Sequence, residues 1–210
     1  MRLYLIRHGE TDYNRDRIIQ GHSKVPLNKT GISQAGCLGI RLREAKLDQI
    51  YSSDLMRAAM TARILSVHTG TPMDFDPGFR ERDPGDLTDK SHEEAIRFFN
   101  DPDFEPPNGE TVKAFDARIT AALRSLIQRE AGRDRTIAVV SHGMVCGSFL
   151  RNHLDCPPEQ QQGVQWRNTS VTIADYDGRW RVVTLCDSSH LDDLEEAADT
   201  KEAPTPNHMR

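Results

Sequence analysis

Two short apolar runs, far apart in the chain, each lead into a histidine that is followed by a glycine. Leu3–Ile6 precedes Arg7-His8-Gly9, and the β-branched run Thr136–Val140 precedes Ser141-His142-Gly143. The second run has the composition of a central strand that is buried on both faces, and the first has good strand propensity. Imidazole and guanidinium groups thus stand where two predicted strands end, and this combination suits the binding of an anion such as phosphate.

Extended and helical patterns alternate along the rest of the chain. Further strands are predicted over residues 48–52 and 72–76, and a hairpin is predicted from residues 171–176 and 180–185. Helices are predicted over residues 30–45, 54–70, 111–126 and 144–154. Asp177-Gly178 is a strong hairpin signal. Thr30 is predicted to cap the first helix, and Ser53 or Asp54 the second. This alternation predicts an α/β fold, with a parallel or mixed sheet covered on both faces.

Two segments are expected to lie outside the sheet and its helices. Residues 11–30 are polar and predict a loop. Residues 83–110 contain several prolines and one short helix that Ser91 and Glu94 open in capping-box spacing, which predicts a small cap inserted into the main domain.

The connectivity brings the polar residues together. Ligands of α/β sheets bind outside the carboxyl ends of the strands. Arg7 and His8 follow the first predicted strand, Arg57 the second, Glu81 the third and His142 the fourth. Two arginines, two histidines and a glutamate are therefore predicted at one end of one sheet.

Composition limits the remaining possibilities. The 210 residues, 37% hydrophobic and 28% charged, are those of an ordinary soluble protein, predicted as one domain over residues 1–190. Residues 191–210 hold six acidic and two basic residues, a net charge of −4 out of −5, and predict an acidic tail. No basic face is evident, so nucleic acid is not expected as a partner. The edge hairpin leaves a homodimer open.

The sequence shows no sign of a membrane or metal protein. No apolar run approaches the ~20 residues of a membrane span. The first apolar run has only four residues before Arg7, which predicts no signal peptide and a cytoplasmic location. The four cysteines form no CxxC pair and are expected to be reduced thiols, mostly buried. No metal-ligand spacing is present, so neither metal nor cofactor is expected.

The ordered set of motifs resembles the histidine phosphatase superfamily, in its phosphoglycerate-mutase-like branch. The matching residues are Arg7-His8-Gly9-Glu10-Thr11, Asn14, Gln20-Gly21, Pro26-Leu27, Thr30-Gly31, Gln34-Ala35, Ser52-Ser53-Asp54-Leu55, Arg57-Ala58, Thr61-Ala62, Glu81, Gly109-Glu110-Thr111, Ser141-His142-Gly143 and Asn168-Thr169-Ser170-Val171. The resemblance covers residues 1–190. It implies a three-layer α/β/α sandwich with a mostly parallel mixed sheet, a small helical cap and a reaction without metal.

The resemblance also implies roles for these residues. His8 is expected to attack phosphorus and form a phosphohistidine, while Arg7, Arg57 and His142 hold the phosphoryl oxygens. Glu81 is the expected general acid and base. Asn14, Gln20, Gly21 and the backbone N–H of Gly143 are expected to contact the substrate.

Simpler interpretations stand beside these. Arg57 can be a solvated or ion-paired helix residue. Glu81, between Arg80 and Arg82, can be a surface ion pair. His22 and His190 can line the pocket or be ordinary polar residues. After Glu81, residues 83–89 depart from the pattern of the superfamily and keep only Gly85, and Lys24 stands where Asp is common.

Three functions follow from these observations. The first is a phosphatase that acts on a small phosphorylated metabolite. The second is a cofactor-dependent phosphoglycerate mutase, which the 28-residue spacing between Glu81 and Glu110 and the acidic tail disfavour. The third is a phosphate-binding protein without turnover, which the altered residues after Glu81 keep open.

Overall fold

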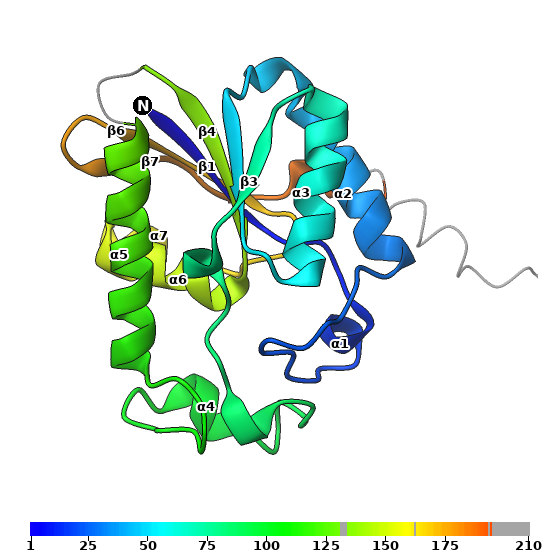
Figure 1. The fold of residues 1–210 in the computed structure, drawn as a ribbon, viewed down its shortest axis with the longest axis vertical. Helices are drawn as coiled ribbons and strands as arrows, with labels where there is room; N and C mark the ends of the chain where they lie inside the picture. The colour runs from blue at the N-terminus through cyan, green and yellow to red at the C-terminus, as the bar shows by residue number, and fades with distance from the viewer. Residues whose placement is uncertain (131–133, 162, 193, 195–210) are drawn as a thin grey trace, which may run out of the picture.

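One mixed sheet organises the protein. The computed structural model describes residues 1–130, 134–161, 163–192 and 194 (Figure 1). Within them the strands are β1 (Arg2–Arg7), β2 (Gln49–Ser52), β3 (Met73–Phe75), β4 (Thr136–Ser141), β5 (Leu154–Asp155), β6 (Val171–Tyr176) and β7 (Trp180–Asp187). Their order is β3-β2-β4-β1-β6-β7-β5. The pairs β1–β4, β2–β3, β2–β4 and β5–β7 are parallel, whereas β1–β6 and β6–β7 are antiparallel.

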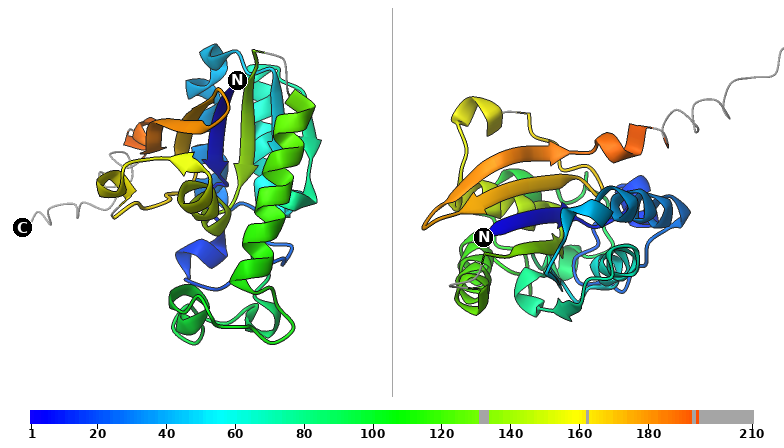
Figure 2. Two further views of the ribbon diagram at one scale, coloured as in Figure 1. Left: turned by 90° about the vertical axis from the view of Figure 1, so that its left-hand side faces the viewer. Right: turned by 90° about the horizontal axis from the view of Figure 1, so that it is seen from above.

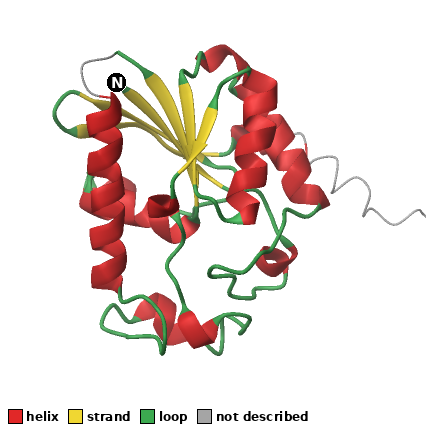
Figure 3. Ribbon diagram, viewed as in Figure 1, coloured by secondary structure: helices red, strands yellow, loops and turns green. Residues whose placement is uncertain are grey.

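Helices pack on both faces of this sheet (Figures 2 and 3). The α-helices are α1 (Asp12–Arg15), α2 (Lys29–Arg41), α3 (Met56–Thr69), α4 (Ile96–Asn100), α5 (Val112–Glu130), α6 (Gly143–Asn152) and α7 (Pro158–Gln161). Short 3-10 helices are η1 (Arg43–Ala45), η2 (Pro77–Phe79), η3 (Gly85–Leu87) and η4 (Ser189–Leu191).

The alternation of side chains along the central strands creates two cores. Leu3 and Leu5 of β1 pack with residues of α5 and α6, whereas Ile6 packs with residues of α2 and α3. In β4, Ile137 and Val139 belong to the first core and Ala138 and Val140 to the second. Both faces of the sheet are therefore buried, which explains the continuous apolar runs. The predicted three-layer α/β fold with a mostly parallel mixed sheet is confirmed.

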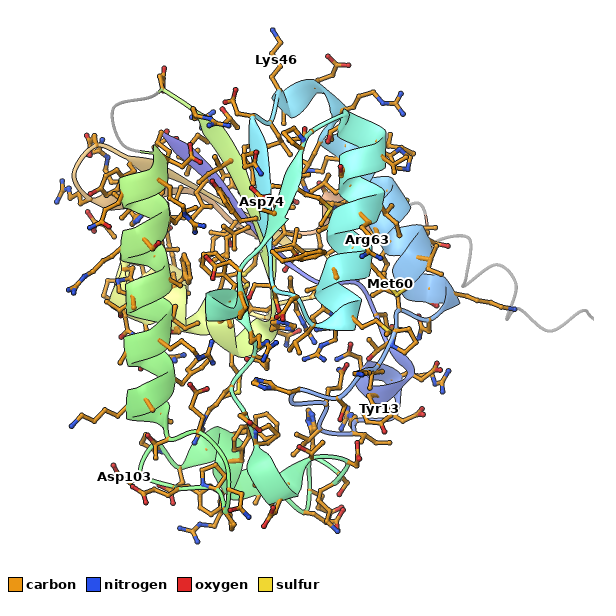
Figure 4. All side chains as sticks on the ribbon, in the orientation of Figure 1. Tyr13, Lys46, Met60, Arg63, Asp74 and Asp103 are labelled. Carbon is orange, nitrogen blue, oxygen red and sulfur yellow. The ribbon has the colours of Figure 1, made fainter. Side chains whose placement is uncertain are left out.

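The segment of residues 83–110 forms the cap beyond the carboxyl ends of β1 and β4, with α4 at the bottom of Figure 1. The cap has a small core of its own, in which Ala95 and Phe98 pack with Ile19. Figure 4 shows Asp103 on the cap and Lys46 at the opposite end of the molecule. The division into one domain over residues 1–190 and an acidic tail stays a prediction, and residues 193 and 195–210 of that tail lie outside the described residues.

Local capping differs from the predictions in three places. The N-cap of α2 is Asn28, whose side chain accepts a hydrogen bond from Gly31 N, so the prediction of Thr30 was wrong. Helix α3 begins after Leu55 without any side-chain cap, because the hydroxyl of Ser53 is used elsewhere. The predicted reciprocal bonds between Ser91 and Glu94 exist, but the helix of the cap begins only at Ile96.

Short elements were missed. The segment predicted as a loop over residues 11–30 contains α1, which Thr11 and Asn14 cap reciprocally in a capping box. The two-residue strand β5 and the one-turn helix α7 were also not predicted, because elements this short carry no periodicity. In the described part of the chain no helix is long and apolar enough to cross a membrane. All four cysteines are free, although only Cys146 and Cys156 are fully buried.

Candidate active site

Two histidines leave the sheet side by side. Strands β1 and β4 are parallel, and their register pairs Arg7 with Ser141. The next residues, His8 and His142, therefore emerge together, and the backbone N–H of His8 still donates to the carbonyl of Ser141 at 2.9 Å. The centroids of the two imidazole rings lie 5.1 Å apart, with the ring planes inclined by 59°. Parallel pairing thus places two residues that are 134 positions apart in the chain in one site.

The hydrogen bonds of His8 define its tautomer. Its Nδ1 lies 2.7 Å from the carbonyl oxygen of Gly9, which can only accept, so Nδ1 carries the proton. In the neutral ring Nε2 then has a free lone pair. Arg57 donates its Nε–H to this atom at 3.2 Å. His8 is 3% exposed, and these two hydrogen bonds hold its ring in one orientation with Nε2 unprotonated.

Two guanidinium groups, one of them fully buried, flank His8. Arg57 is 1% exposed and donates from Nη2 to the carbonyl of Gly21 at 2.9 Å, while its Nη1 is buried without a partner. Arg7 donates from Nη1 to the carbonyl of Trp166, and its Nε is also buried without a partner. Buried donors normally find acceptors, so these two nitrogens indicate a site for an anion. The interpretation of Arg57 as a solvated helix residue was wrong.

His142 lies behind His8. It is fully buried, and its Nε2 is hydrogen-bonded to the hydroxyl of Ser53 at 2.9 Å, while its Nδ1 is a third buried nitrogen without a partner. The same hydroxyl accepts the backbone N–H of Leu55 at 3.2 Å. Ser53 therefore orients His142 and does not cap α3.

Glu81 approaches from the base of the cap. One carboxyl oxygen, Oε1, accepts the backbone N–H of Arg82 at 3.0 Å, and Oε2 accepts that of Met144, in the first turn of α6, at 3.1 Å. Arg80 pairs with Asp54, and Arg82 donates to backbone carbonyls, so neither forms an ion pair with Glu81. The interpretation of Glu81 as part of a surface ion pair was wrong.

Burial and mutual repulsion shift the protonation of these groups. Burial, aided by the positive charges of Arg57 and Arg7, holds the pKa of His8 well below its usual value of 6.5. Burial first, and then Arg57, lower the pKa of His142 in the same way. Burial raises the pKa of Glu81 above 4.5, although its two backbone hydrogen bonds and both arginines oppose this shift. The site thus favours neutral histidines and shifts the carboxyl group of Glu81 toward its protonated form.

A cavity of about 200 Å³ connects most of these groups. Its lining includes the predicted residues Arg7, His8, Asn14, Gln20, Gly21, Arg57, Glu81 and Gly143. His142 is not among the lining residues, but its ring lies beside that of His8. Of the nine predicted site residues, eight therefore line one cavity, and the ninth packs next to one of them.

The predicted substrate contacts differ in how they are held. Asn14 uses Oδ1 as an acceptor for the backbone N–H of Thr11 at 3.2 Å and for Nδ2 of Asn168 at 3.4 Å. Gln20 lies beside the hydroxyl of Thr11 at 3.0 Å. Gly21 has a φ of +47°, and an added Cβ would lie 2.4 Å from Pro84, so only glycine fits at this position.

The altered residues after Glu81 form a tightly packed turn. Gly85 has a φ of +55°, and an added Cβ would lie 2.1 Å from the carbonyl oxygen of Pro107. This explains why Gly85 is the one residue of the usual pattern that is kept. Arg118 of α5 supports the preceding segment by donating to the carbonyls of Gly78, Arg80 and Glu81. Arg118 also binds the carboxylate of Glu110 at 2.7 Å.

Several residues of the site were missed from the sequence. Asn168 lies in a matched motif and donates to the carbonyl of His8 at 2.9 Å, but was not included among the site residues. The cavity is also lined by Arg82 and by apolar and aromatic residues, namely Ile18, Ile19, His92, Phe98, Phe99 and Met144. Only tertiary contacts identify these residues, because none of them belongs to a sequence motif that indicates a binding site.

Two further histidines lie outside the cavity. His22 donates from Nε2 to the carbonyl of Glu81 at 2.9 Å and faces neighbouring grooves. His190 is hydrogen-bonded to Arg41 and Thr169. Lys24 lines the groove beside His22 and not the cavity of His8. Among the described residues no cluster of three or more histidine, cysteine, aspartate or glutamate side chains is placed to hold a metal ion.

Comparisons with known proteins agree with this geometry. The probable phosphoglycerate mutase GpmB of Citrobacter koseri is 34% identical over 207 residues, which cover 91% of this chain and 95% of that protein. The structure of YhfR of Bacillus stearothermophilus is 33% identical, with a TM-score of 0.82, over 91% of this chain and 99% of that one. The mycobacterial glucosyl-3-phosphoglycerate phosphatase Rv2419c is 28% identical, with a TM-score of 0.77, over 87% of this chain and 97% of that one. The sequence profile of the histidine phosphatase superfamily (branch 1) matches residues 3–188, and the chain therefore belongs to this superfamily.

Proposed function

We propose that the protein is a phosphatase that hydrolyses a small phosphomonoester through a phosphohistidine on His8, without a metal ion. The observation that carries the proposal is the presence of two unpartnered buried guanidinium nitrogens, from Arg7 and Arg57, near His8, whose unprotonated Nε2 has only the Nε–H of Arg57 as a partner. A phosphoryl group would supply acceptors for both nitrogens and place phosphorus next to the nucleophile.

The first step is an in-line displacement at phosphorus. The Nε2 lone pair of His8 forms the new P–N bond while the ester P–O bond breaks. Arg57 gives up its hydrogen bond to Nε2, and with Arg7 donates to the equatorial oxygens, whose negative charge the two cations stabilise. Protonated Glu81 transfers its proton to the leaving oxygen, which departs as an alcohol.

The second step reverses these roles. The carboxylate of Glu81 takes a proton from a water molecule that attacks phosphorus, the P–N bond breaks, and the neutral His8 and inorganic phosphate are released. The hydrogen bonds from Arg82 N and Met144 N keep this carboxylate in place in both ionisation states. In this proposal the raised pKa of Glu81 favours the protonated form that acts as the acid. The lowered pKa of His8 keeps its imidazole neutral, so that it can attack without a separate base.

The remaining predicted residues complete the phosphate site. His142, held by Ser53, packs beside the ring of His8, with the two ring centroids 5.1 Å apart. Asn14 and Gln20 line the mouth of the cavity, and the absence of a side chain at Gly21 and Gly143 leaves room for the phosphoryl oxygens.

The test is the release of phosphate from a panel of phosphomonoesters with a chelator present. The wild type is expected to release phosphate, His8→Ala to lose this activity, and a rapid-quench experiment to trap acid-labile phosphate on the protein. His153→Ala is the matched control, because His153 lies at the end of α6 and bonds Thr120 outside the cavity. Phosphate release that persists in His8→Ala would contradict the proposal, and loss of activity in the chelator would contradict its metal-free form.

The second candidate is a cofactor-dependent phosphoglycerate mutase. The name of the GpmB relatives favours it. Conversion of 3-phosphoglycerate to the 2-isomer without net phosphate release would decide for the mutase. Neither reaction in a folded wild type that still binds phosphate would decide for the third function, a binding protein without turnover.

A further inference from the structure

The cavity of His8 has two chemically different ends. The end at the sheet carries Arg7, Arg57 and His8, whereas the end at the cap is lined by Ile18, Ile19, Phe98, Phe99 and Met144. The apolar side chains come from three segments, namely the residues after α1, the cap helix α4 and the start of α6. A phosphoryl group held at His8 would direct the rest of its ester toward this apolar end.

Arg82, the cation at the cap end, is already hydrogen-bonded to backbone carbonyls of the protein. Arg82 is 1% exposed, and its Nε, Nη1 and Nη2 donate to the carbonyls of Glu110, Phe98 and Phe104 at 2.8, 3.0 and 3.1 Å. Its guanidinium carbon also lies 4.2 Å from the centre of the Phe98 ring, which covers one of its faces. Arg82 thus holds the cap together, and each of its nitrogens already has an acceptor.

The other polar group at this end is uncharged. His92 stacks near Phe99, with ring centroids 4.6 Å apart, and burial with the charges of Arg17 and Arg7 lowers its pKa below 6.5. At neutral pH it offers one donor and one acceptor and no positive charge. Arg17 itself does not line the cavity. Among the described lining residues, the charged donors that lack acceptors therefore lie at the phosphate end.

We infer that the substrate of this site is a monoester of a compact, uncharged alcohol with an apolar body, about one ring in size, and not an ester that carries a second anionic group. The inference rests on the proposed function, because it takes this cavity as the phosphomonoester site. The reaction needs only water as co-reactant, which splits the ester into the alcohol and inorganic phosphate.

Size and solvation both support this choice. The cavity of about 200 Å³ lies below the range of roughly 300–1,000 Å³ that is usual for ligand sites, so it encloses only a compact leaving group. A carboxylate at the cap end would lose part of its water shell, and the one cation there, Arg82, is already bound to three carbonyls and covered on one face by Phe98. Discrimination by an apolar subsite is typically 10- to 200-fold for small changes in a ligand. We therefore expect at least a tenfold preference for the apolar ester.

The experiment compares three esters with alkoxide leaving groups, namely 2-phenylethyl phosphate, glycerol 1-phosphate and 3-phosphoglycerate. Their dissociation constants are measured by calorimetry on His8→Ala at pH 7, so that turnover does not disturb binding. The expected order of affinity is 2-phenylethyl phosphate, then glycerol 1-phosphate, then 3-phosphoglycerate, with about tenfold or more between the first and the last. Tightest binding of 3-phosphoglycerate, or equal binding of the first two esters, would overturn the inference.

Matched phenylalanine variants test the assignment of the subsite. Phe99 lines the cavity and is 40% exposed, whereas Phe75 is 45% exposed and lines a different groove. Phe99→Ala, made in the His8→Ala background, is expected to reduce the preference about fivefold, and Phe75→Ala to leave it unchanged. An unchanged preference in the Phe99 variant, or the same loss in both, would contradict the subsite.

The same esters separate this inference from the proposed function. If wild type releases phosphate but binding does not follow the expected order, the phosphatase stands and the inference fails. If binding follows the order but wild type releases no phosphate from any ester, the selectivity of the cavity stands and the proposed hydrolysis fails.

Discussion

Arg57 is predicted to lower the free energy of unfolding of the protein when no phosphate is bound. Arg57 and Arg82 are equally buried, at 1% exposure, but only Arg82 has an acceptor for each guanidinium nitrogen. Arg57 donates only to His8 and to the carbonyl of Gly21, and its Nη1 has no partner. The positive charge of Arg7 also lies nearby. Burial lowers the pKa of Arg57 to about 10, opposed by Glu81 and assisted by Arg7. Replacement by methionine, which keeps the apolar stem, is therefore expected to stabilise the protein without phosphate.

The magnitude follows from the pKa. The difference between 12.5 and about 10 corresponds to about 3 kcal/mol against the charged form of Arg57 in the folded state. Loss of its hydrogen bonds to His8 and to the carbonyl of Gly21 offsets about 2 kcal/mol of this gain. Arg57→Met is thus expected to raise the free energy of unfolding by about 1 kcal/mol. Arg82→Met is expected to lower it by about 3 kcal/mol, because it leaves three carbonyls without their donor, that of Phe98 buried and those of Glu110 and Phe104 partly buried.

Urea denaturation at pH 7, with and without phosphate, measures these changes. Phosphate at 100 times its dissociation constant stabilises wild type by about 2.7 kcal/mol and does not stabilise Arg57→Met, so the order of the two proteins is expected to reverse. If Arg57→Met without phosphate is as unstable as Arg82→Met, Arg57 is a structural residue and the argument from unpartnered donors fails.

Three further predictions test the carboxyl group, the second histidine and the support of the cap. Glu81→Gln is expected to reduce kcat/KM at least 100-fold for alkyl esters. The loss is expected to be far smaller for 4-nitrophenyl phosphate, because its leaving group departs without protonation. Equal losses for both kinds of ester would exclude Glu81 as a general acid. Folded His142 binds a proton only far below pH 6.5, whereas the unfolded chain binds one near 6.5, so this site makes wild type less stable as pH falls. His142→Gln is expected to remove about 1.2 kcal/mol per pH unit of that slope between pH 6 and 5, as measured by urea titrations, and an unchanged slope would refute the assignment. Arg118→Met is expected to lower kcat/KM about tenfold and stability by about 2 kcal/mol, whereas Lys113→Met on the exposed side of α5 changes neither. Full activity in the Arg118 variant would show that this contact does not position Glu81.

Long-range connectivity was readable from the sequence because it depends on periodicity and strand order. The apolar runs at Leu3 and Thr136 are continuous because both faces of the sheet are covered, and parallel strands end at the same edge. These two facts are enough to bring Arg7, His8 and His142 together. Strand order also placed Arg57 and Glu81 at this end of the sheet, whereas the motifs that resemble the superfamily added Asn14, Gln20, Gly21 and Gly143 to the predicted site.

The protonation states and the apolar end of the cavity depend on burial and on contacts between distant segments. Ser53 reads as a helix cap but binds His142, because the parallel pairing of β2 and β4 brings them together. Arg82 reads as a surface charge, yet it is buried where three carbonyls of the cap converge. The local sequence determines secondary-structure propensity and the spacing of apolar residues. The burial of a side chain and its hydrogen-bond partners are decided only when distant segments of the chain pack together. For this reason the residues of the proposed phosphate site could be predicted from short motifs and strand order, whereas the apolar end of the cavity is formed only by the packing of the cap.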